Sequence, residues 1–350
     1  MKNNILSVLK YLVFLLIGLL LLWLALRGLN FEKIWSEFRA ARYSWLLMAM
    51  IPGFISHISR AARWNIMIES MGYKTRLFST FHAVMMGYFA NMAVPRLGEI
   101  TRCTVLSRRD NIPLNGLIGT VIAERLFDTL CLGIIAFLVI IGQFSFLQNF
   151  LRKVFWSPLS ENLPTGAGLI TVLAISIFGG IFLFWLLLKF SMPFIRRLSF
   201  YKKMKDLLLG FAAGIKTIKN LKHKRAFLFH TLLIWFMYFL MTYIPFRALQ
   251  ATSHLTLLDA TTLLMMGTFA MVVPVPAGIG AYHWIITKTL TDVYNIASEP
   301  AASFALMAHA AQILFIVVIG IISFMLIISS KNNPANAKAI PFERKNISPD

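Results

Sequence analysis

Long apolar runs constrain the fold of this chain more than any other feature of its sequence. A helix that crosses a bilayer needs about 20 mainly apolar residues. Six such runs are separated by polar segments: Tyr11–Leu26, Trp45–Ile58, Gly116–Gly142, Gly166–Phe190, Ala226–Phe246 and Ala301–Ile328. Hydrophobic residues make up 58 % of the chain and charged residues 14 %, whereas soluble domains are about one quarter charged. The sequence therefore predicts an all-α polytopic membrane protein with six transmembrane helices and excludes a water-soluble globular enzyme.

Two further apolar stretches, Leu77–Leu106 and Leu257–Tyr294, are interrupted by proline and glycine. Each half is too short to cross a bilayer alone, and non-helical backbone at that depth needs a protein-lined or wet cavity. We therefore expect two re-entrant helical hairpins. The residues expected to break them are Pro95, Gly98, Pro274, Pro276, Gly278 and Gly280.

The two hairpins carry an internal repeat. The sequences of residues 85–90 (MMGYFA) and 265–270 (MMGTFA) match at five of six positions. Each half of the chain, residues 1–142 and 143–330, also has the order span, span, hairpin, span. If one half starts inside and the other outside, the halves form an inverted-topology repeat, an arrangement typical of alternating-access transporters.

Charge orients the chain in the membrane. The formal net charge is +20, but the 34 Lys and Arg residues lie in short segments between apolar runs, which favours a membrane explanation over nucleic-acid binding. Residues 191–225 carry ten Lys or Arg against one acid, Asp206, which predicts a cytoplasmic amphipathic helix. This helix is interpreted as a positive-inside segment or as a contact for anionic lipids. Both termini are then cytoplasmic in a bacterial or archaeal cell (inner) membrane, and residues 331–350 form a disordered tail.

Ionisable residues inside an apolar span are candidates for function, because each charge costs about 2.5–3.5 kcal/mol at the helix centre. Glu124, Arg125 and Asp128 lie within the span that starts at Gly116. Arg125 precedes Asp128 by three residues and can neutralise one acid. The natural partner for the remaining acid is Arg96 or Arg102.

These two arginines flank the first hairpin break, between Asn91 and Arg102. Arginine offers a planar pair of donors that suits phosphate, and a helix N-terminus adds a favourable dipole. The segment thus predicts a site for a phosphate-bearing headgroup. The alternative is structural, an ion pair between Glu99 and Arg102 that staples the hairpin.

The second half is polar but nearly uncharged. His309 and Gln312 lie in the last span, three residues apart like Arg125 and Asp128 in the first half. His283 follows the second break. An isolated histidine on an apolar face is more often a hydrogen-bonded structural residue than a proton relay. Arg60 and Arg63, at the end of the second span, are expected to be interfacial anchors rather than ligands.

Motifs for soluble chemistry are missing from the sequence. It contains no Walker-type phosphate loop, HExxH, GxSxG or paired CxxC, which argues against an ATPase or a standard hydrolase. Cys103 and Cys131 are its two cysteines, so no disulfide framework or paired-cysteine metal site is expected. We expect no cofactor and no metal.

Four motifs together resemble the transmembrane, flippase-like domain of lysylphosphatidylglycerol synthases and its stand-alone bacterial and archaeal relatives. They are Arg60-Ala-Ala-Arg63-Trp64, the segment from Asn91 through Pro95-Arg96-Leu-Gly98-Glu99 to Arg102, Glu124-Arg125-Leu-Phe-Asp128, and Pro276-Ala-Gly278-Ile-Gly280. The resemblance covers most of the chain. It implies movement of an aminoacylated or glycosylated phospholipid, or of a polyprenyl-linked lipid, between leaflets.

Two departures from that family limit the expectation. The soluble aminoacyl-transferase domain of the full synthases is missing from these 350 residues, so we expect no enzymatic activity. His283 stands where the second hairpin of the family often has Glu, which puts handling of a cationic headgroup in doubt.

The sequence is thus interpreted as a lipid translocase. The alternatives are a secondary transporter of a small anion and a membrane scaffold for a separate lipid-modifying enzyme. Expected partners are anionic membrane lipids, such an enzyme and further copies of the chain, but no nucleic acid. The candidate lipid-binding residues are Asn91, Arg96, Glu99, Arg102, Glu124, Arg125, Asp128, His283, His309 and Gln312.

Overall fold

The computed structural model describes residues 2–142 and 221–331, and helices are the regular secondary structure in these two ranges. The chain divides into two compact units, Met1–Val139 with Ile218–Asp350, and Ile140–Thr217. Nearly all the described residues belong to the first unit. The predicted span Gly166–Phe190, most of the predicted amphipathic helix and the tail lie outside the described residues.

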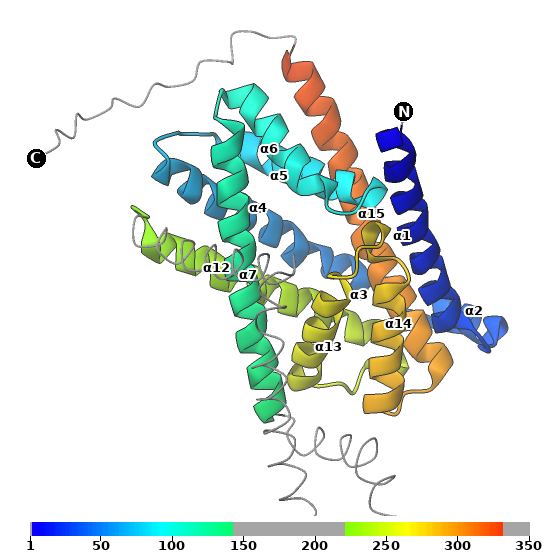
Figure 1. Ribbon diagram of the computed structural model, residues 1–350. Helices are drawn as coiled ribbons and strands as arrows, with labels where there is room; N and C mark the ends of the chain where they lie inside the picture. The colour runs from blue at the N-terminus through cyan, green and yellow to red at the C-terminus, as the bar shows by residue number, and fades with distance from the viewer. Residues whose placement is uncertain (1, 143–220, 332–350) are drawn as a thin grey trace, which may run out of the picture. The chain divides into compact units, whose positions relative to one another are not determined.

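Three helices are long and apolar enough to cross a membrane. They are α7 (Leu114–Gly142), α12 (Lys224–Tyr243) with its 3-10 extension η2 (Ile244–Ala248), and α15 (Ser298–Lys331) (Figure 1). The helix α1 (Lys2–Leu26) and the amphipathic α2 (Phe31–Ala40) meet at 87° and make a fourth candidate. The chain is therefore an all-helical, multi-pass membrane protein over the described ranges, and a total of six spans stays a prediction.

The boundaries predicted for the second span are wrong. The expected Trp45–Ile58 is split at Ala49 into α3 (Tyr43–Met48) and α4 (Met50–Ser70), and α4 continues well past Ile58. Its buried face carries polar side chains as well as apolar ones. The polar residues on it are Ser56, His57, Ser59, Arg60 and Arg63. Hydrophobicity alone did not locate the end of this helix, because polar partners on other helices stabilise its second half.

The first predicted hairpin is a pair of helices, α5 (Leu77–Ala93) and α6 (Leu97–Asp110), that pack together (Figure 1). Pro95 lies in the short break, and Arg96 there adopts a left-handed φ of 65°. The helices touch backbone to backbone, since a Cβ on Gly98 would lie 2.1 Å from the carbonyl oxygen of Gly87. Asn91 accepts a 2.6 Å hydrogen bond from the Gly98 N–H and so satisfies a free donor at the start of α6.

The second predicted hairpin consists of α13 (Leu257–Ala270) and α14 (Ala281–Lys288). Residues 271–280 form the break, which includes Pro274 and a 3-10 turn, η4 (Pro276–Gly278). Ala277, Gly278 and Gly280 all have positive φ, at 53°, 74° and 84°. A Cβ on Gly280 would lie 1.9 Å from the Gly18 carbonyl oxygen, so this break lies directly against α1. A short 3-10 turn, η3 (Gln250–Thr252), precedes the hairpin, and a π-helical turn, η5 (Thr289–Val293), follows it.

Two hydrophobic clusters form the interior of this unit. One surrounds the first hairpin and includes Trp64, Ile68, Leu106, Leu117 and Phe227. The other surrounds the second hairpin and includes Phe246, Leu263, Ile286, Leu290 and Phe304. Each cluster thus holds one broken helix pair, while Phe227 of α12 packs in the first. The inverted relation of the two halves, and their division at residue 142, stay predictions.

We expect Gly98→Ala to destabilise the protein by about 1–3 kcal/mol, because the new methyl group overlaps backbone atoms of α5. Gly119→Ala is the matched control, since a Cβ at Gly119 in α7 meets nothing within 4 Å. Thermal unfolding in detergent should show a lower midpoint for Gly98→Ala and an unchanged or slightly higher one for the control. Equal midpoints would contradict the close contact of α5 and α6.

Candidate functional site

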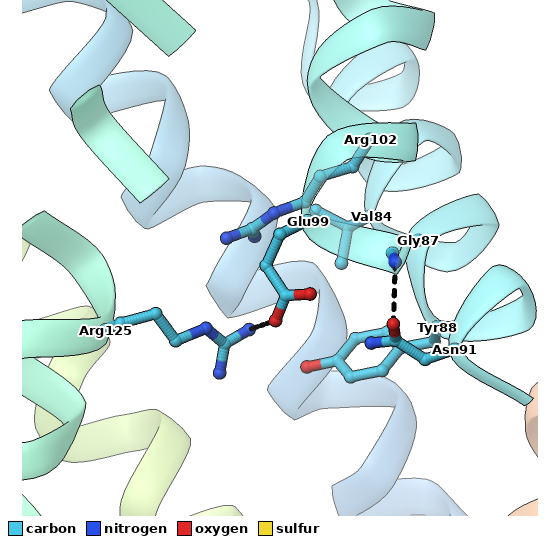
Figure 2. Close-up of a pocket in the computed structure, with 8 residues that line it drawn as sticks. Val84, Gly87, Tyr88, Asn91, Glu99, Arg102 and Arg125 are labelled. Atoms are coloured by element: carbon cyan, nitrogen blue, oxygen red, sulfur yellow. Dashed lines mark hydrogen bonds and ion pairs between the residues drawn. The ribbon is translucent and has the colours of Figure 1, made fainter. Parts of the chain in front are cut away.

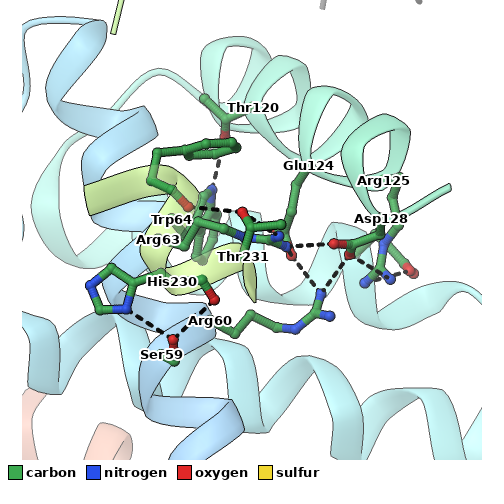
Figure 3. Close-up of polar contacts among 12 residues, drawn as sticks. Ser59, Arg60, Arg63, Trp64, Thr120, Glu124, Arg125, Asp128, His230 and Thr231 are labelled. Atoms are coloured by element: carbon green, nitrogen blue, oxygen red, sulfur yellow. Dashed lines mark hydrogen bonds and ion pairs between the residues drawn. The ribbon is translucent and has the colours of Figure 1, made fainter. Parts of the chain in front are cut away.

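Two arginines of α4 face the carboxylates of α7. Arg60 and Arg63 lie one turn apart and are only 3 % and 0 % exposed (Figure 3). The Arg60 guanidinium contacts Glu124 at 2.5 Å and Asp128 at 3.3 Å, and that of Arg63 contacts the same two carboxylates at 3.2 and 2.8 Å. Their prediction as interfacial anchors is wrong. Two buried carboxylates on α7 need buried counter-charges, and α4 supplies them.

Arg102 of α6 is the third guanidinium at Glu124. Its Nη2 lies 3.0 Å from Glu124 Oε2, and its guanidinium lies 4.8 Å from the centre of the Trp64 ring. The indole N–H of Trp64 in turn donates to the Thr120 hydroxyl at 2.8 Å. Of the two partners predicted for this acid, Arg102 is therefore found in place. Arg96 is exposed and forms no ion pair with any described residue.

Arg125 links the break of the first hairpin to α7. Its side chain, 45 % exposed, lies 3.6 Å from Glu99 (Figure 2). It also lies 3.9 Å from Asp128 (Figure 3). The predicted contact with Asp128 is thus present but long. The alternative staple between Glu99 and Arg102 is not formed, because Glu99 pairs across to α7 and Arg102 turns to Glu124.

Together these side chains form one charge cluster. Its members are Arg60, Arg63, Glu99, Arg102, Glu124, Arg125 and Asp128. Four guanidinium groups face three carboxylates, so the charge cluster keeps one net positive charge. Arg102 Nε and Glu99 Oε2 are buried without a hydrogen-bond partner among the described atoms. An uncompensated buried cation is costly, and a bound anion would relieve that cost.

A small pocket opens beside the charge cluster. Its lining residues are Val84, Gly87, Tyr88, Asn91, Gly98, Glu99, Arg102 and Arg125 (Figure 2). In this conformation it has room for about one water molecule. The contact between Glu99 and Arg125 lies at this pocket. Arg102 lines the same pocket, so three charged side chains of the charge cluster meet there.

α12, from the other half of the sequence, completes the site. The Tyr238 hydroxyl accepts from Arg60 at 2.9 Å, and the Thr231 hydroxyl accepts from Arg63 at 3.3 Å. Sequence reasoning missed Arg60, Arg63 and Tyr238 as members of this site. The i, i+3 spacing of the two arginines, which puts them on one face of α4, was the available signal.

The candidates of the second half form a separate group. His283 and His309 contact each other at 3.3 Å, and Gln312 lies half-buried further along α15. Within the described ranges, no hydrogen bond or ion pair joins these three residues to the charge cluster. The same ranges contain no group of three or more His, Cys, Asp or Glu side chains suited to a metal ion.

Comparison with known proteins identifies the family of the chain. The family described as the lysylphosphatidylglycerol synthase TM region matches residues 8–320. The chain belongs to this family. A UPF0104 membrane protein of Methanocaldococcus jannaschii is 28 % identical over 123 residues, which is 34 % of this chain and 37 % of that relative. The match thus spans little more than a third of the relative's length. No solved structure is significantly similar to the chain.

Glu124→Gln should destabilise the protein by about 3–5 kcal/mol, because three guanidinium groups lose a fully buried counter-charge. Glu99→Gln is the control, since Glu99 is partly exposed, has one long ionic contact and should cost about 1 kcal/mol or less. Thermal unfolding of both variants in detergent measures the difference. A Glu124→Gln midpoint equal to that of Glu99→Gln would mean that the buried network does not hold α4, α6 and α7 together.

Proposed function

We propose that this protein moves a phosphate-bearing lipid between the leaflets of a membrane. The observation that carries the proposal is the net positive charge of a buried cluster beside a broken helix pair, in a multi-pass member of a lipid-related family. A headgroup phosphodiester carries about one negative charge and would neutralise the cluster. Membership of the family supports a membrane role related to lipids, and the positive charge at the site supports the more specific proposal of lipid movement.

The arginines at the pocket suit a phosphate. Guanidinium groups offer paired donors that match two phosphate oxygens, and such charge-assisted hydrogen bonds are among the stronger ones in proteins. Arg102 and Arg125 approach the pocket from different helices, so they contact a headgroup from two sides. The first turn of α6 begins next to the pocket at Leu97 and adds the favourable dipole of a helix N-terminus.

The carboxylates of the charge cluster have two tasks in this proposal. Glu124 and Asp128 hold Arg60 and Arg63 in place, and Glu99 occupies Arg125 until a headgroup displaces it. Release of Glu99 also frees a carboxylate for a cationic headgroup. The proposed substrates are thus aminoacylated or glycosylated phospholipids and polyprenyl-linked lipids, moved without covalent change in a bacterial or archaeal cell membrane with both termini in the cytoplasm.

Arg125→Gln should lower leaflet exchange at least about tenfold, the loss of one charge-assisted contact to phosphate. Purified protein in liposomes is assayed with fluorescent phospholipids and polyprenyl phosphates. Arg108→Gln, an exposed arginine at the end of α6, is the matched control and should exchange lipid like the wild type. Arg96→Ala tests separately the predicted role of the exposed arginine at the break.

Exchange at the wild-type rate in the Arg125→Gln variant would refute the proposed site. Uptake of inorganic phosphate into the same vesicles without any lipid exchange would instead support a transporter of a small anion, which the net positive charge also permits. Absence of both activities would favour the scaffold, which charge reversal of residues 202–224 and recovery of a lipid-modifying enzyme would then test.

A further inference from the structure

Two buried histidines close a hydrogen-bonded chain at the second hairpin. His283 in α14 is 7 % exposed and His309 in α15 is 2 % exposed. The Gly280 N–H donates to His283 Nδ1 at 3.1 Å, His283 Nε2 contacts His309 Nδ1 at 3.3 Å, and His309 Nε2 contacts the Ala277 carbonyl oxygen at 3.1 Å. Both ends of this chain lie in the break between α13 and α14.

The two backbone ends determine where the protons are. Since the Gly280 N–H is a donor, His283 Nδ1 is an acceptor and its proton sits on Nε2. Since the Ala277 carbonyl is an acceptor, His309 Nε2 carries a proton and its Nδ1 is free to accept from His283. All three contacts are satisfied when both imidazoles are neutral, with the proton on Nε2 in each.

The surroundings of the pair are uncharged. The titratable side chain next to it is Tyr282, whose ring stacks on His309 with 4.6 Å between centroids. Gly18 of α1 packs against the break, and Met271 lies within the break beside Gly278. None of the ion pairs formed by the described residues of α1, α5, α13 or α15 includes either imidazole, so no carboxylate compensates a charge here.

We propose that the His283–His309 pair is a proton-binding site that controls whether the break of the second hairpin, residues 271–280, stays attached to α15. Three contacts use one backbone N–H and two imidazole N–H groups. A proton taken from water adds a third imidazole N–H. In one of the three contacts, two N–H donors then face each other and no acceptor is left between them. One hydrogen bond of the chain must break, and the new cation has no counter-charge beside it.

Loss of these hydrogen bonds frees the break between α13 and α14. His309 is the side chain of α15 that holds the Ala277 carbonyl, and Ala277 has a positive φ, which a residue with a Cβ adopts only under local constraint. Protonation therefore favours movement of residues 271–280 away from α15. Coupling of that movement to lipid transport rests on the proposed function, whereas the proton site itself does not.

The test measures the hairpin rather than transport. Spin labels are placed on exposed positions of the break and of α15 by Val272→Cys and Leu314→Cys, with Cys103→Ala and Cys131→Ala to remove the native thiols. Distances between the labels are measured by pulsed electron paramagnetic resonance at about pH 8 and about pH 4, the second of which lies well below the titration of a free imidazole. We expect a longer distance population to grow at the lower pH.

The His309→Phe variant keeps an aromatic ring stacked on Tyr282 but removes the hydrogen bonds to His283 and Ala277. It should therefore show the longer distance at both pH values. His254→Ala removes an exposed histidine outside the pair and should respond to pH like the unsubstituted labelled protein. If His309→Phe does not fold, His283→Asn, which also interrupts the chain, replaces it. A distance distribution that does not change with pH, or a pH response that persists in the His309 or His283 variant, would overturn the proposal.

Leaflet exchange under an imposed pH gradient is measured on the same proteins. Exchange that depends on the gradient in wild type and not in His309→Phe would link the proton site to transport. Absence of any exchange together with a pH-dependent distance would refute the proposed function and leave the proton site standing.

Discussion

The burial of one carboxylate, Glu124, determines how the first half of this protein is built. A charge without access to water needs compensation on the spot, and Glu124 has three guanidinium groups from two helices around it. The positions of α4 and α6 relative to α7 follow from that requirement. Tyr238 extends the same network to α12, so a polar group rather than apolar surface joins the two halves of the sequence at this point.

The two hairpins attach to neighbouring helices through different chemistry. The polar contacts of the first hairpin with α7 are made by ionised side chains, Arg102 and Glu99, and those of the second hairpin with α15 by His309. Ionic contacts of arginine with carboxylates persist over a wide pH range, whereas imidazole contacts change when a ring takes up a proton. A shared helix–break–helix pattern therefore carries a permanent charge in one half and a titratable one in the other. That asymmetry fits a transporter in which one site selects the substrate and the other responds to conditions.

Much of the fold could be predicted from local sequence. Apolar length indicated the long helices, proline and glycine indicated both breaks, and the position of Glu124 and Asp128 inside an apolar span marked them as candidates. The partners could not be predicted in this way. Arg63 lies 61 residues from Glu124 along the chain, and near a helix end it has the same local pattern as an arginine that anchors a helix at the interface. Glu99 has an arginine three residues away and another on α7, and only tertiary packing selects the second.

The glycine contact between the second break and α1 has a mechanical consequence. Gly280 lies against Gly18 with no side chain between the two backbones, as is common where membrane helices approach closely. Interlocked side chains would have to leave one set of grooves and enter another for the break to shift along α1. Two backbones in direct contact need no such exchange, so a shift of the break along α1 would meet less resistance here than at an interlocked contact.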